Sequence, residues 1–231
     1  MKYVSILILN ALFVISSGYS QIVFSEGFEG GALPTGWGQE YVSGAINWGY
    51  TSGGNSGHPA AAYEGTKNAI FFFGSYGAEK TKLVTPSIDL SSVTFPVLKF
   101  WHTQDAWGAD QDKLNVYYKT SAAGVWVLLV SYTNEIVNWK EEIISLPNPS
   151  ATYYLAFEAQ TGYGYGVCID KISIEQTPAI PKSLTSISFD QASTQYVLQG
   201  SSTNPVLRMN LNVEGNSGIL DRKSTRLNSS H

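Results

Sequence analysis

Short segments of alternating polarity, each ended by Gly, Pro, Asn or Ser, run through most of this sequence. Segments 114–118 and 153–158 alternate clearly, so each predicts a strand with one buried face. No segment repeats its apolar residues with the 3.6-residue period of a helix. The pattern predicts an all-β fold, a β-sandwich over residues 21–176. We expect strands at 22–28, 68–73, 82–85, 97–102, 113–120, 125–132, 139–145, 153–159 and 167–175.

The composition agrees with that fold and excludes several functions. Charged residues make up 14% of the chain, against about 25% in ordinary domains. The 18 acidic residues outnumber the 14 basic ones, which argues against a partner with a phosphate backbone. For the chain as a whole, we therefore exclude a disordered tail, a coiled coil and a nucleic-acid binder. Cys168 is the only cysteine, so no disulfide holds the fold.

The segments outside this sandwich predict an exported chain. Residues 1–20 contain Lys2, an apolar run and then small polar residues, which is typical of a signal peptide cut before Gln21. The apolar run is too short to span a bilayer, and no later stretch qualifies as a transmembrane segment. We expect a secreted or cell-surface protein. Residues 177–182 predict a Pro-containing linker, and 183–220 the truncated start of a second β domain.

The last eleven residues, 221–231, read DRKSTRLNSSH. They match, codon by codon, the translation of a common sequencing-adapter oligonucleotide. Two of the three arginines of the chain, Arg222 and Arg226, fall there. We interpret 221–231 as adapter-derived, with a natural disordered tail as the alternative.

Two carboxylates on predicted strands indicate a cation site. Strict alternation places Glu26 on the face of Phe24 and Phe28, and Asp170 on the face of Ile172. An unpaired charge facing an apolar layer costs several kcal/mol, so each carboxylate needs a partner. If the two strands pair, one calcium ion satisfies both.

Further oxygen ligands are available for that calcium. Glu29, Asn68 and main-chain carbonyls are the candidates to complete its coordination. The alternative is that Lys99 or backbone NH groups satisfy the two carboxylates, or that the strand ends are exposed.

Two polar, glycine-containing loops carry aromatic residues. Trp107 lies in 103–112, and Tyr163 and Tyr165 lie in 161–166. Aromatic side chains in such loops bind sugar rings or a partner protein. The alternative is that Trp107 folds back to cap the sandwich, while the two tyrosines cover an open sheet end.

The sequence contains no recognisable catalytic constellation. Ser56 precedes His58 in a Gly-rich segment that is typical of a turn. His102 alternates with apolar neighbours, so we expect a hydrogen-bonded inner residue. Glu141 and Glu142 are adjacent and point to opposite faces, which excludes a glycosidase pair. Cys168, in an apolar strand, is expected to be packing.

Several short motifs occur in an order that resembles a known family. They are 26–29 (EGFE), 33–37 (LPTGW), 47–48 (NW), 81–86 (TKLVTP), 98–100 (LKF), 112–117 (DKLNVY) and 167–172 (VCIDKI), with Trp126 and Trp139. Over residues 22–175 the chain resembles a MAM-like jelly roll. It is most similar to the cleaved-adhesin modules of gingipain-type haemagglutinins and to the choice-of-anchor J group. The resemblance implies a two-sheet jelly roll with structural calcium, whose first-strand Glu and last-strand Asp are Glu26 and Asp170.

Together these features predict a non-catalytic adhesion or carbohydrate- or protein-binding module of a larger multidomain surface protein, stabilised by calcium. We expect a monomeric module whose partner is a glycan or an extracellular host or matrix protein. One alternative is a targeting appendage of a secreted peptidase or glycosidase whose catalytic domain is missing from this fragment. Another is a purely structural spacer.

Overall fold

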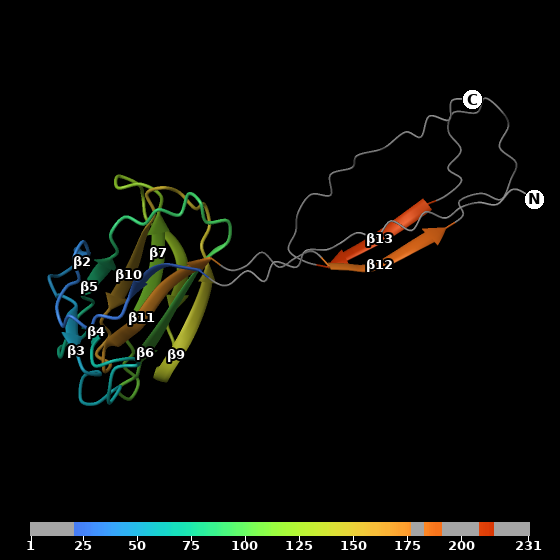
Figure 1. The fold of residues 1–231 in the computed structure, drawn as a ribbon. Helices are drawn as coiled ribbons and strands as arrows, with labels where there is room; N and C mark the ends of the chain where they lie inside the picture. Colours follow the sequence, from blue (N-terminus) through green and yellow to red (C-terminus); the bar gives the residue numbers. More distant parts are fainter. Residues whose placement is uncertain (1–20, 177–182, 191–207, 215–231) are drawn as a thin grey trace, which may run out of the picture. The chain divides into compact units, whose positions relative to one another are not determined.

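The computed structural model describes residues 21–176, 183–190 and 208–214, which contain strands and no helix. Residues 21–176 form two antiparallel sheets packed face to face (Figure 1). The first sheet has the order β3-β4-β11-β6-β9, with β1 also paired to β11, and the second has the order β2-β5-β10-β7-β8. The first contains β1 (Gln21–Glu26), β3 (Gly49–Thr51), β4 (Asn68–Phe71), β6 (Pro96–Gln104), β9 (Ile136–Ser145) and β11 (Val167–Gln176). The second contains β2 (Gly38–Ser43), β5 (Lys80–Val84), β7 (Lys113–Lys119), β8 (Val127–Tyr132) and β10 (Tyr154–Gln160).

The predicted all-β sandwich is confirmed, and each of the nine expected strands is present. The sequence did not indicate β2 or β3. Most side chains of β2 are exposed, so it carries no apolar alternation, and β3 has only three residues. None of the described residues belongs to a helix long and apolar enough to cross a bilayer.

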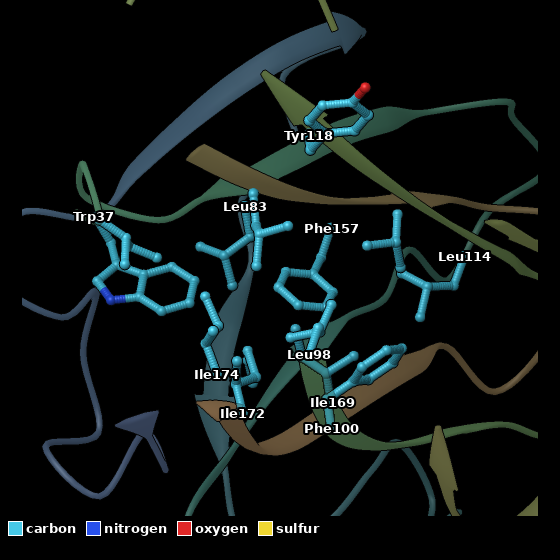
Figure 2. Packing of buried hydrophobic residues seen from close by; sticks show 14 of the residues in the cluster. Trp37, Leu83, Leu98, Phe100, Leu114, Tyr118, Phe157, Ile169, Ile172 and Ile174 are labelled. Carbon is cyan, nitrogen blue, oxygen red and sulfur yellow. The ribbon is translucent and has the colours of Figure 1, made fainter. Parts of the chain in front are cut away.

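The core lies between the sheets and is made of inward-facing alternate residues from both (Figure 2). Leu98 and Phe100 come from β6, and Leu114 comes from β7. The rings of Phe100 and Phe157 meet edge to face, with centroids 5.2 Å apart. Because that contact joins β6 to β10, it connects the two sheets directly.

A β-bulge interrupts the alternation of β11. The strand pairs with β6 through Asp170–Trp101 and then Ser173–Lys99, which leaves one extra residue in β11. The residue after Asp170 has a φ of 47°. Beyond the bulge the faces are exchanged, so Asp170 lies on the outer face of the sheet, opposite to Ile172. The prediction that these two share the apolar face was wrong, because strict alternation does not hold across a bulge.

Strands β12 (Ser183–Asp190) and β13 (Arg208–Glu214) form an antiparallel pair in a second compact unit, separate from the unit that contains the sandwich. Residues 1–20, 177–182, 191–207 and 215–231 lie outside the described residues. The interpretations of a signal peptide, a linker and an adapter-derived tail fall on those segments.

Candidate functional site

Asp112, just before β7, fixes the loop between β10 and β11. Its Oδ1 accepts the Gly162 amide at 2.6 Å, and its Oδ2 accepts the Gly166 amide at 2.7 Å. The Gly164 amide donates to the same carboxylate. Burial raises the pKa of Asp112, while these amides oppose the rise. A Cβ at Gly164 would lie 2.7 Å from Asp112 Oδ2, so the close approach requires glycine.

Trp107 lies at the tip of the loop between β6 and β7. Its amide donates to the Asp110 carbonyl at 3.0 Å, and the Asp110 amide donates back at 3.1 Å. The turn that these bonds close contains Gly108 at a φ of 65°. The indole is 50% exposed, and its ring lies edge-on to that of Tyr163 with centroids 5.1 Å apart. Trp107 therefore stands at the surface and is not part of the core.

The structure brings the three predicted aromatic residues together around one hollow of about 270 Å³. Tyr76 joins them, because its ring stacks on Tyr163 at 4.1 Å and is 73% exposed. The sequence did not predict Tyr76, since its loop lies far from Tyr163 along the chain. The hollow is lined by Trp107, Tyr163 and Tyr165, and also by Asn55, Ser56, Phe72 and Phe73.

The ring of His58 stacks on that of Tyr165 and does not itself line the hollow. The two rings stack with centroids 3.8 Å apart and planes 12° apart. His58 Nδ1 lies 2.6 Å from the carboxylate of Asp105, which is largely buried. The Tyr165 amide donates to the Asp105 carbonyl at 3.1 Å. Asp105 therefore contacts both residues of this stacked pair, His58 through its side chain and Tyr165 through its main chain. The sequence did not indicate this role.

These contacts define what we call the aromatic hollow. Its rings provide flat apolar surface, and the amide of Asn55 and the hydroxyl of Ser56 provide hydrogen-bonding groups beside it. A few polar groups among aromatic side chains suit a ligand with apolar faces and polar edges, such as a sugar ring.

The predicted cation site has a different construction. Asp170 Oδ2 accepts the amides of Tyr63 and Glu64 at 2.9 and 3.1 Å, and its Oδ1 accepts the Lys171 amide at 2.7 Å. Asp170 is fully buried, and burial raises its pKa to about 6, with the charge of Glu29 adding to the rise. Backbone NH groups therefore supply part of the compensation that we expected calcium to provide for the buried Asp170 charge.

The other three proposed calcium ligands also have protein partners. Glu29 accepts the amides of Thr66 and Lys67, at 3.0 and 3.1 Å, and these bonds lower its pKa. Glu26 Oε1 accepts the Phe28 amide at 2.6 Å.

Asn68 faces the neighbouring loop. Its Oδ1 accepts the Gly53 amide at 2.7 Å, and its Nδ2 donates to the Gly53 carbonyl at 3.2 Å. Both the oxygen and the nitrogen of the Asn68 side chain are therefore already hydrogen-bonded to the main chain of Gly53.

Glu26, Glu29 and Glu64 line one surface groove of about 470 Å³, which we call the acidic groove. Their carboxylate oxygens are the hard donors that calcium prefers. Within residues 21–176 and the two later strands, no three His, Cys, Asp or Glu side chains group closely enough to hold a metal. A calcium ion here would rest on at most two carboxylates, completed by carbonyls and water.

The remaining sequence predictions concern residues away from both regions. His102 is fully buried, its Nε2 lies 3.4 Å from Glu142 Oε1, and burial lowers its pKa to about 4. Glu141 pairs with Trp101 and Glu142 with Phe100, which puts these carboxylates on opposite faces as expected. Burial raises the pKa of Cys168 to about 12.

No family model matches the sequence, and no curated protein matches it. Solved structures do share the fold. The K1 cleaved adhesin domain of Lys-gingipain from Porphyromonas gingivalis W83 is 20% identical with a TM-score of 0.51, over 70% of this chain and 100% of that one. The K3 domain is 21% identical with a TM-score of 0.53, over 68% and 99%. The sandwich of this protein has the fold of the cleaved adhesin domains, as its sequence motifs predict.

Proposed function

We propose that this domain is a non-catalytic binding module that recognises a glycan, or a glycan-bearing extracellular host or matrix protein, through the aromatic hollow. The observation that carries the proposal is the half-exposed indole of Trp107, held at the rim beside Tyr163. Asp112 supports it further, because it fixes the loop that carries Tyr163 and Tyr165 before a ligand binds and so reduces the entropy lost on binding. Adhesion is also the role named for the domains that share this fold.

Replacing Trp107 with Ala tests this proposal. An exposed aromatic anchor contributes at an interface, so we expect Trp107→Ala to weaken glycan binding by about 1 kcal/mol or more. Its melting temperature should change little, because the ring is outside the core. Tyr41→Ala is the matched control, since Tyr41 is 51% exposed on β2. Glycan-array screening followed by calorimetry measures both, and equal affinities for Trp107→Ala and wild type would contradict the proposal.

Calcium at the acidic groove is a second part of the proposal. Glu26 and Glu29 are two of the carboxylates that line the groove, and Asp170 is a buried carboxylate whose pKa a nearby cation would lower. A cation that binds only the folded chain raises its stability, so excess chelator should lower the melting temperature. Adding calcium back, but not magnesium, should restore it. An identical melting curve with and without chelator would contradict calcium binding at the acidic groove.

The leader-like sequence of residues 1–20 supports export, and hence a secreted or surface location, as part of the same proposal. In this account the module is monomeric and belongs to a larger multidomain protein. An attached hydrolase remains the alternative context for the same binding role.

A further inference from the structure

The outer face of the second sheet differs in charge from the rest of the sandwich. Residues 21–176 contain fifteen Asp and Glu, eight Lys and no Arg. Four of those lysines lie on this one face, because each alternates along β5 or β7 with residues buried in the core. They are Lys80, Lys82, Lys113 and Lys119.

One of the four is neutralised within the sheet. Lys82 Nζ lies 2.5 Å from Glu158 Oε2, and both side chains are almost fully buried. The other Glu158 oxygen accepts Asn115 Nδ2 at 3.2 Å and the Tyr117 hydroxyl at 3.3 Å. This network is satisfied internally, so a ligand gains little from it.

The other three lysines form no ion pair among the described residues. Lys80 and Lys113 stand on either side of Gln160 in one cross-strand row. Two strand spacings separate them by about 10 Å, and Lys119 lies about 20 Å along β7 from Lys113. The charges are spread too widely for one small anion and suit a chain that carries separate anionic groups.

Aromatic rings flank the Lys119 end of this face. Lys119 Nζ lies 4.5 Å from the ring centre of Trp126 and 5.3 Å from that of Tyr154. Trp126 Nε1 donates to Glu40 Oε2 at 3.0 Å, so the indole is held over the sheet by β2. Rings beside spaced cations are the groups that recognise a charged sugar chain.

We propose that this outer face, the basic face, binds an acidic polysaccharide. It goes beyond the function proposed above, since it uses a separate surface and none of the residues of the aromatic hollow. A polyanion is the favoured occupant because an otherwise acidic domain places on this face three lysines that form no ion pair among the described residues. A polysaccharide fits better than a nucleic acid, because residues 21–176 contain no arginine to bind phosphate through two hydrogen bonds.

The test compares polygalacturonate with its fully methyl-esterified derivative, which has the same sugar backbone but carries an uncharged methyl ester in place of each carboxylate. Using the full chain in calorimetry at low salt, we expect binding of the charged form only. Raising the salt should weaken it, since exposed charges are screened over about 10 Å at 0.1 M ionic strength. Lys80→Gln with Lys113→Gln should lower the affinity by about tenfold. The charge-matched control, Lys67→Gln with Lys140→Gln, should change it less than about twofold.

Three outcomes would overturn the proposal: equal binding of the esterified polymer, an equal effect of the control pair, or tighter binding of single-stranded DNA than of polygalacturonate. Circular dichroism of the two double variants shows whether each is folded. Folding is expected for the variant at Lys80 and Lys113, because both side chains lie outside the core. A Trp107→Ala variant that still binds polygalacturonate separates this surface from the aromatic hollow.

Discussion

Asp112 and Asp170 are two buried aspartates that organise surface loops by the same means. Asp112 accepts main-chain amides of the loop between β10 and β11, and Asp170 accepts amides of the loop that precedes β4. Burial raises the pKa of both. In each case a short-range cluster of NH groups keeps a loop fixed on the sandwich.

The two loops differ in where their tyrosines go. The loop on Asp112 presents Tyr163 to the edge of an exposed Trp107. The loop on Asp170 turns Tyr63 onto the first sheet, where its ring stacks on Trp101 at 3.8 Å. The same carboxylate anchor therefore builds an open aromatic surface in one region and a closed, packed one in the other. Ring placement, rather than aromatic content, identifies the candidate site.

The largest effect is expected from removing the anchor of the open region. Asp112→Ala leaves the loop amides buried without an acceptor, which should lower the free energy of unfolding by about 3 kcal/mol. Glycan binding should fall as well, because Tyr163 and Tyr165 lose their fixed positions. Asp89→Ala, at an exposed aspartate that only caps its own turn through Ser91, is the control. Chemical denaturation gives the free energies of unfolding. An Asp112→Ala variant as stable as wild type would show that Asp112 does not anchor the loop.

The sequence predicted the open region better than the closed one. Glycines around Tyr163 and Tyr165 already indicated a loop whose rings are accessible. The bulge after Asp170 has no such signal, because a lysine takes the positive φ. Alternation alone therefore assigned Asp170 to the wrong face.

Contacts between distant loops explain the other omissions. Tyr76 and His58 stack on the two tyrosines of the aromatic hollow, and Asp105 contacts His58. These three residues come from separate loops, and no local pattern links them. The core strands were predictable because each needs only its own apolar alternation.

A smaller effect should appear in the pH dependence of the closed region. The folded pKa of Asp170, about 6, lies above its ordinary 3.8. Between these values the folded state binds more protons, so its contribution is fully present below about pH 4 and is lost as pH rises to about 6. Asp170→Asn does not titrate there. The wild-type free energy of unfolding minus that of Asp170→Asn should fall by about 2 kcal/mol across this window.

That difference should be measured by urea denaturation in chelator at several pH values. The titration of His102, which acts in the opposite direction because its pKa is lowered, is common to both proteins and cancels. A difference that stays constant or grows with pH would show that burial does not control the Asp170 carboxyl.

In our interpretation the open region binds the glycan, whereas the closed region only stabilises the fold. The most direct measurement is the affinity of Tyr163→Ala and Tyr63→Ala for the glycan that the wild-type chain binds, together with the stability of each. We predict that Tyr163→Ala loses about 1 kcal/mol of binding and little stability. Tyr63→Ala should lose stability and keep its affinity, because its ring packs on Trp101 and Trp139. Loss of affinity in Tyr63→Ala with normal affinity in Tyr163→Ala would contradict the account.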